Sequence, residues 1–95
     1  MATVSIAAPV GPVPMPCMAS GTAFPSPGRT LTRMAYQINN GPLHPIGSYV
    51  PGGGMWNFQL TTADCPQPGP YLLTVFAGDN GGDFTPCPGN FYRQS

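Results

Sequence analysis

The sequence contains no lysine and no glutamate, and only 6% of its 95 residues carry a full charge. Three arginines balance three aspartates, so the formal net charge at pH 7 is zero. Nucleic-acid binding depends on Lys and Arg side chains that neutralise phosphates, and three separated arginines cannot supply them. The same lack of positive charge argues against binding to anionic membrane surfaces. We therefore expect neither a nucleic acid nor an anionic membrane as a partner.

Long apolar runs are also absent. A membrane-spanning helix needs about 20 consecutive apolar residues, and no stretch of the chain approaches that length. The first residues lack the basic region and apolar stretch of a secretory signal. We expect no membrane insertion. Because so few charges leave little repulsion between copies, we do expect protein partners or self-association.

The sequence is poor in residues that could form a catalytic or metal site. His44 is the only histidine, and it lies between Leu43 and Pro45 in a weakly patterned segment. The only close carboxylate pair is Asp79 with Asp83, in a predicted exposed turn where we expect no acid–base catalysis. No Cys-x-x-Cys pair is present to support a zinc site. We expect no enzymatic activity, no catalytic residues, no metal and no cofactor.

Proline and glycine, by contrast, are abundant. The 14 Pro and 13 Gly exceed a quarter of the chain and disfavour helices, because Pro lacks a backbone N–H and Gly loses extra entropy on ordering. The chain is 41% hydrophobic and 11% aromatic, which is enough apolar material for a folded core. Its length fits a single domain over residues 1–95.

Alternating apolar and polar residues predict strands between the Pro- and Gly-rich turns. The pattern is clearest over residues 31–38, 55–61 and 71–77, where alternate side chains share one face of a strand. The side chains expected in the core are Met34, Tyr36, Ile38, Trp56, Phe58, Leu60, Tyr71, Leu73 and Val75. Strands with weaker patterns are predicted at residues 3–7, 17–24, 43–50 and 89–93. The proline-rich residues 8–16 are expected to form an extended connection.

Short strands separated by turns indicate a small all-β sandwich or barrel. Four segments add a resemblance: VSIAAP (4–9), SGTA (20–23), GMWNFQL (54–60) and GPYLLTVFAGDN (69–80). In their order and spacing they resemble bacterial immunoglobulin-like and fibronectin type III-like repeats over most of the chain. The resemblance implies an immunoglobulin-like antiparallel β-sandwich of about seven strands, with Trp56 and Tyr71 as core packing residues.

Cys17, Cys65 and Cys87 allow one disulfide with a thiol left over, or no disulfide at all. In the sandwich that the resemblance implies, the second strand begins at the end of the domain where the loop before Tyr71 lies. Cys87 follows a loop at the opposite end. We therefore expect a Cys17–Cys65 disulfide. The alternative is three free thiols that pack as small hydrophobic groups.

Taken with the resemblance, these features predict a non-enzymatic structural or adhesive module of a cell-surface, appendage or other extracellular assembly. One alternative is a decoration or tail module of a phage virion. Another is a glycan- or calcium-binding module, in which exposed aromatic side chains stack on sugars. The candidates for such stacking are Tyr49, Phe76, Phe91 and Tyr92. For the loop at 79–83 we expect a turn instead of a calcium site, because Ca²⁺ takes six to eight oxygen ligands.

Overall fold

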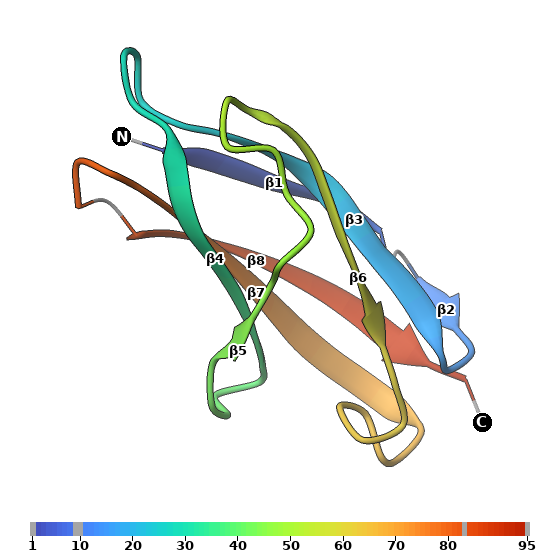
Figure 1. The fold of residues 1–95 in the computed structure, drawn as a ribbon. Coiled ribbons are helices and arrows are strands. Elements are labelled where there is room, and N and C mark those ends of the chain that lie inside the picture. Colours follow the sequence, from blue (N-terminus) through green and yellow to red (C-terminus); the bar gives the residue numbers. More distant parts are fainter. Residues whose placement is uncertain (1, 9–10, 83, 95) are drawn as a thin grey trace.

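The chain folds into two β-sheets, seen in the computed structural model of Figure 1, which describes residues 2–8, 11–82 and 84–94. The strands in this part of the chain are β1 (Thr3–Ala8), β2 (Pro12–Val13), β3 (Cys17–Phe24), β4 (Leu31–Ile38), β5 (His44–Pro45), β6 (Gly54–Leu60), β7 (Gly69–Asp79) and β8 (Phe84–Arg93). One sheet has the order β1-β3-β6, and the other has the order β2-β8-β7-β4-β5. The all-β prediction is confirmed, with eight strands and no helix in the described residues.

The last strand is twice as long as expected. It was predicted over 89–93, but β8 begins at Phe84 and runs through Pro86 and Pro88. Tyr92 and Gln94 donate their N–H groups away from β7, to the carbonyls of Gly11 and Val13. The N–H and C=O groups of successive residues in a strand point to alternate sides. Those of the even-numbered residues of β8 therefore point away from β7, toward the sheet edge. Both prolines therefore lack an N–H group only where β7 does not need one.

β2 is a short strand inside the proline-rich segment that was expected to be an extended connection. Pro12 and Val13 pair in parallel with Tyr92 and Arg93 of β8. Two hydrogen bonds between these segments use carbonyls of the proline-rich segment as acceptors, Gly11 O at 3.2 Å and Val13 O at 2.8 Å. Because these bonds require only carbonyl acceptors from the segment, the N–H groups that its prolines lack are not needed for pairing.

The strand predicted at 43–50 is much shorter than expected. Within this segment, only β5 pairs regularly with β4. Beyond β5, the Ile46 N–H donates to Met34 O, and Ser48 O accepts the Asn57 N–H of β6. The segment thus leaves one sheet and reaches the other, and Figure 1 shows it crossing between β4 and β6. Pro45 and Gly47 interrupt the pairing that a continuous strand would need.

The core lies between the two sheets. Met34, Tyr36, Trp56, Leu60, Leu73 and Val75 are buried, while Ile38, Phe58 and Tyr71 are partly buried against them. The Tyr36 and Phe58 rings stack at 4.1 Å between centroids. The Trp56 indole donates to Thr22 O at 3.2 Å, which satisfies the one polar group of a fully buried side chain.

Candidate functional site

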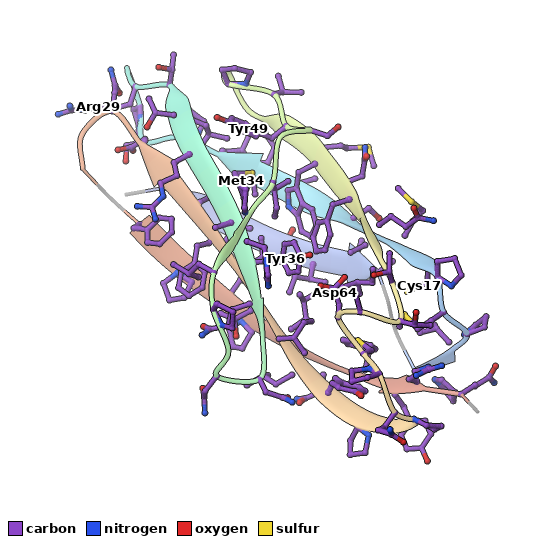
Figure 2. All side chains as sticks on the ribbon, turned by 60° about the horizontal axis from the view of Figure 1, so that its bottom comes forward. Cys17, Arg29, Met34, Tyr36, Tyr49 and Asp64 are labelled. Atoms are coloured by element: carbon purple, nitrogen blue, oxygen red, sulfur yellow. The ribbon has the colours of Figure 1, made fainter. Side chains whose placement is uncertain are left out.

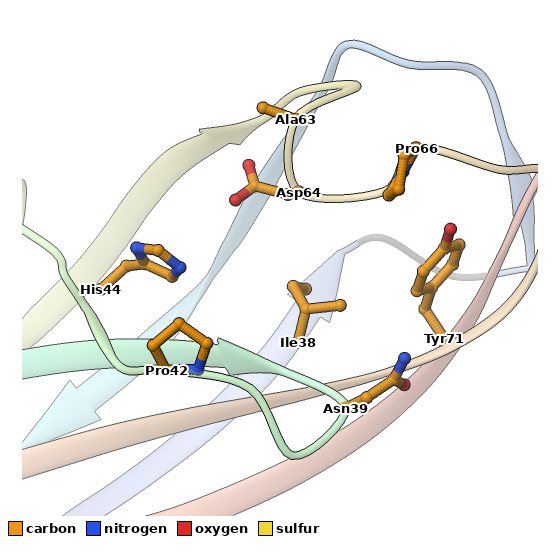
Figure 3. Close-up of a pocket in the computed structure, with 8 residues that line it drawn as sticks. All are labelled: Ile38, Asn39, Pro42, His44, Ala63, Asp64, Pro66 and Tyr71. Carbon is orange, nitrogen blue, oxygen red and sulfur yellow. The ribbon is translucent and has the colours of Figure 1, made fainter.

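A cleft of about 470 Å³ opens where β4 ends beside the loop that joins β6 to β7. Figure 3 shows its side chains arranged around Ile38. The lining residues are Ile38, Asn39, Pro42, His44, Ala63, Asp64, Pro66 and Tyr71. The volume falls within the range of about 300–1,000 Å³ that is typical of small-molecule sites.

Asp64 is held in place by its own loop. Its N–H donates to Thr61 O at 3.0 Å, while its Oδ2 accepts the Thr61 N–H at 3.1 Å. Its Oδ1 accepts a hydrogen bond of 3.0 Å from the Tyr36 hydroxyl on β4. Figure 2 shows Tyr36 and Asp64 close together near the middle of the molecule. The carboxylate is thus oriented from two sides before any ligand arrives.

His44 enters the cleft from the opposite wall. It pairs with Tyr36 in the β4–β5 register and so lies on the same face of the sheet. Its ring is tilted by 32° against the Tyr36 ring, with 5.1 Å between centroids. In Figure 3 the imidazole and the Asp64 carboxylate face the same space, but no hydrogen bond joins these two described side chains.

Asn39 and Tyr71 complete the polar part of the lining. Asn39 adopts a positive φ of 55°, which asparagine tolerates better than most residues, and its Oδ1 accepts the Leu72 N–H at 3.0 Å. The Tyr71 hydroxyl donates to Gln67 O at 2.7 Å and accepts the Gln67 N–H at 3.1 Å. Both side chains are therefore fixed by backbone groups.

Burial and the Asp64 charge govern the acid–base behaviour around the cleft. Burial raises the pKa of Tyr36 to about 12, and the hydrogen bond to Asp64 adds to the effect. Burial likewise raises the pKa of the Cys65 thiol to about 11, with a further contribution from Asp64. Neither group therefore becomes a nucleophile near neutral pH.

The predicted disulfide is absent, because all three cysteines are free thiols. The Cys17 thiol is directed instead at the Met15 sulfur, 4.0 Å away. Cys65 is fully buried in the core, where a thiol packs as a small hydrophobic group. The alternative of free thiols describes the structure better than the Cys17–Cys65 bond.

The Asp79 carboxylate connects two loops. It is only 4% exposed, and its oxygens accept N–H groups from Ser26 at 3.1 Å and Gly81 at 2.8 Å. Asp83, the second carboxylate of that loop, lies outside the described residues. Within the described residues, no group of three or more His, Cys, Asp or Glu side chains could hold a metal ion.

The four aromatic candidates for sugar stacking occupy different places. Phe91 is buried and stacks on Tyr71, and Tyr49 packs against the core. Phe76 stacks on Phe84 at 4.9 Å on the outer face of the five-stranded sheet. Tyr92 is 48% exposed. None of the four lines the cleft.

Sequence reasoning did not identify Asp64 or Asn39 as site residues, and it treated His44 as an ordinary loop residue. Each of the three carries a hydrogen-bonding side chain in or beside a turn, but so do many surface residues. They meet only because the end of β4 and the 61–68 loop lie at one end of the sandwich.

The described chain also contains no helix long and apolar enough to cross a membrane.

Comparison with known proteins gives a likeness of fold. No family model matches the sequence, and no curated protein matches it. Among solved structures, the endo-β-1,4-mannanase from Thermotoga petrophila is similar with a TM-score of 0.76 and 11% sequence identity. The match covers 100% of this chain and 20% of the mannanase chain. This chain is thus a small all-β domain that spans about a fifth of the length of that enzyme.

Proposed function

We propose that the chain is a non-catalytic, carbohydrate-binding module of immunoglobulin-like fold, working outside the cell as an ancillary part of a polysaccharide-processing or surface assembly. The observation that carries the proposal is the preformed cleft lined by Asp64, His44 and Tyr71. The likeness of the whole chain to a fifth of a mannanase supports an ancillary role beside a larger catalytic unit.

Two features support the immunoglobulin-like assignment. The sheet orders β1-β3-β6 and β2-β8-β7-β4-β5 fit a sandwich in which one sheet gains an extra strand beyond β4. Tyr71 stands near the beginning of β7, and its hydroxyl bonds back to Gln67. This contact has the form of the tyrosine corner of immunoglobulin-like domains.

Purified protein should be tested for retention on insoluble β-1,4-mannan, cellulose and xylan, together with release of reducing sugars. We expect retention on at least one polysaccharide and no hydrolysis. Failure to bind any glycan, including soluble oligosaccharides, would remove the carbohydrate-binding role. Release of reducing sugars would show an enzyme instead of an ancillary module.

A second candidate function is structural, through association with another copy of the chain. The outer face of the five-stranded sheet carries Phe76 and Phe84, and Arg33 lies 4.2 Å above the Phe84 ring. Zero net charge leaves little repulsion between copies. Sedimentation over a range of concentrations tests this role, and a monomer at millimolar concentration would exclude it.

A further inference from the structure

We infer that the cleft holds a neutral sugar unit and discriminates against glycans that carry carboxylate groups. This inference rests on the proposed carbohydrate-binding function and specifies its ligand class. It follows from three properties of the lining: the sign of its charge, the hydrogen-bonding groups left over, and the rigidity of its walls.

The lining carries few ionisable side chains, and His44 is the only basic one among the described residues. Asp64 is the only acidic residue that the described part of the chain places in the lining, and none of the described lining residues is Arg or Lys. Arg93 donates to the carbonyl of Cys65, the residue after Asp64, at 2.6 Å, and it is not one of the lining residues. Arg33 is engaged with Phe84. An acidic sugar would therefore place a second carboxylate near Asp64 without a lining Arg or Lys between them.

The remaining hydrogen-bonding groups suit sugar hydroxyls. Asp64 Oδ1 accepts one hydrogen bond, from Tyr36, and an ionised carboxylate oxygen can accept a second. A hydroxyl that donates to this oxygen forms a charge-assisted bond, which is stronger than a neutral one. The Asn39 amide uses its oxygen for Leu72, which leaves its NH₂ group to donate to a ligand.

The walls are fixed before binding. The Tyr71 hydroxyl is tied to the Gln67 backbone, and the His44 ring leans on Tyr36. Since these side chains already have the positions that a ligand would meet, binding loses less conformational entropy. Rings at the sides of a cleft also provide apolar surface for the C–H faces of a sugar.

Isothermal titration calorimetry can compare two matched ligands, a β-1,4-linked manno-oligosaccharide and a β-1,4-linked mannuronate oligosaccharide of equal length. They differ by a carboxylate at each C6. A glucose and glucuronate pair extends the test to a second sugar. At about pH 8 and low salt, we expect the neutral member of a pair to bind at least tenfold more tightly.

Asp64→Asn should weaken binding of the neutral ligand roughly tenfold and reduce the preference over the uronate. His44→Ala, at an exposed position, should weaken binding without unfolding the domain. Asn57→Ala, on the outer face of the three-stranded sheet, is the matched control and should leave affinity unchanged. Thermal unfolding of each variant shows whether the fold is intact.

The outcomes separate the two proposals. If neither neutral nor acidic oligosaccharides bind, the proposed function itself fails. If the uronate binds as tightly as the neutral ligand or more tightly, the ligand class is wrong while glycan binding stands. If a folded Asp64→Asn and a folded His44→Ala both bind normally, the cleft is not the site.

Discussion

Gly21 stands where β3 has no room for a side chain. A Cβ atom at this position would collide with the Ser5 carbonyl oxygen and lie 2.7 Å from Cζ2 of Trp56. The backbone of β1 and a fully buried indole cannot both move aside in a packed core. Gly21 therefore allows β1, β3 and Trp56 to pack together.

We expect Gly21→Ala to destabilise the domain by about 3 kcal/mol, the upper part of the range for overpacked cores. Urea unfolding measures the change in the free energy of unfolding. Gly47→Ala is the control, because apart from its chain neighbours no atom of the described residues lies within 4 Å of the added Cβ, and it should change stability by no more than about 0.5 kcal/mol. Equal stabilities for the two variants would contradict the close packing.

The Tyr71 hydroxyl ties the loop before β7 to the strand itself. It makes two hydrogen bonds with the backbone of Gln67, and the ring stacks on Phe91 at 5.7 Å. Tyr71→Phe keeps the ring and removes both bonds, so we expect a loss of about 1–2 kcal/mol in unfolding free energy. Tyr92→Phe, at a position 48% exposed, should be neutral. A neutral Tyr71→Phe would mean that the corner contributes nothing.

Prolines in β8 reduce the number of N–H donors that the edge of the five-stranded sheet exposes. Beyond the short pairing with β2, Pro86 and Pro88 occupy the edge-facing positions of β8 and present no N–H donor there. An unpaired row of donors on a sheet edge is a template for pairing with another chain. The two prolines therefore protect this edge from association.

The double variant Pro86→Thr/Pro88→Thr should fold but associate more strongly than the parent chain, because two backbone donors become available at the edge. Sedimentation velocity at increasing concentration measures the association. Asn90→Thr alters a neighbouring edge-facing position without adding a backbone donor, and it should behave like the parent. If the double variant stays as monomeric as Asn90→Thr, the prolines do not protect the edge.

These elements also show how far sequence patterns reach. Alternation predicted β4 over its full observed span, 31–38, and placed β6 and β7 correctly, because each strand has one face on the core. Patterns failed at β2 and at the first half of β8, where pairing depends on which partner lies on each side. Pro86 would break the pairing of a strand with neighbours on both sides, but it does not disturb an edge strand. The sequence alone does not show whether the segment around Pro86 lies at an edge.

For the whole molecule, the candidate site was less predictable than the core. Core residues follow a local period of two, whereas the cleft joins Asn39, His44 and Asp64 from segments that meet only in the folded chain. The disulfide prediction was wrong for a related reason. It used the topology to bring Cys17 and Cys65 to one end, but topology does not determine where each sulfur points, and Cys17 faces Met15.

The burial that shapes this end of the sandwich also makes global stability sensitive to alkaline pH. The pKa of Tyr36 rises from 10.0 to about 12 on folding, and that of Cys65 rises from 9.0 to about 11. Below about pH 8 both groups are largely protonated in the folded and unfolded states, so their contribution to the free energy of unfolding is nearly constant. As pH rises from about 9 to 12, the unfolded state releases these protons first, so the free energy of unfolding falls.

Ionisation of each group should lower the free energy of unfolding by an amount on the order of 2 kcal/mol over this range. Urea unfolding under reducing conditions, at intervals from about pH 8 to pH 12, measures this decrease. Tyr36→Phe should flatten the curve above pH 10, and Cys65→Ala should flatten it between about pH 9 and 11. A parent protein equally stable at pH 8 and pH 11 would show that neither group is buried as the fold requires.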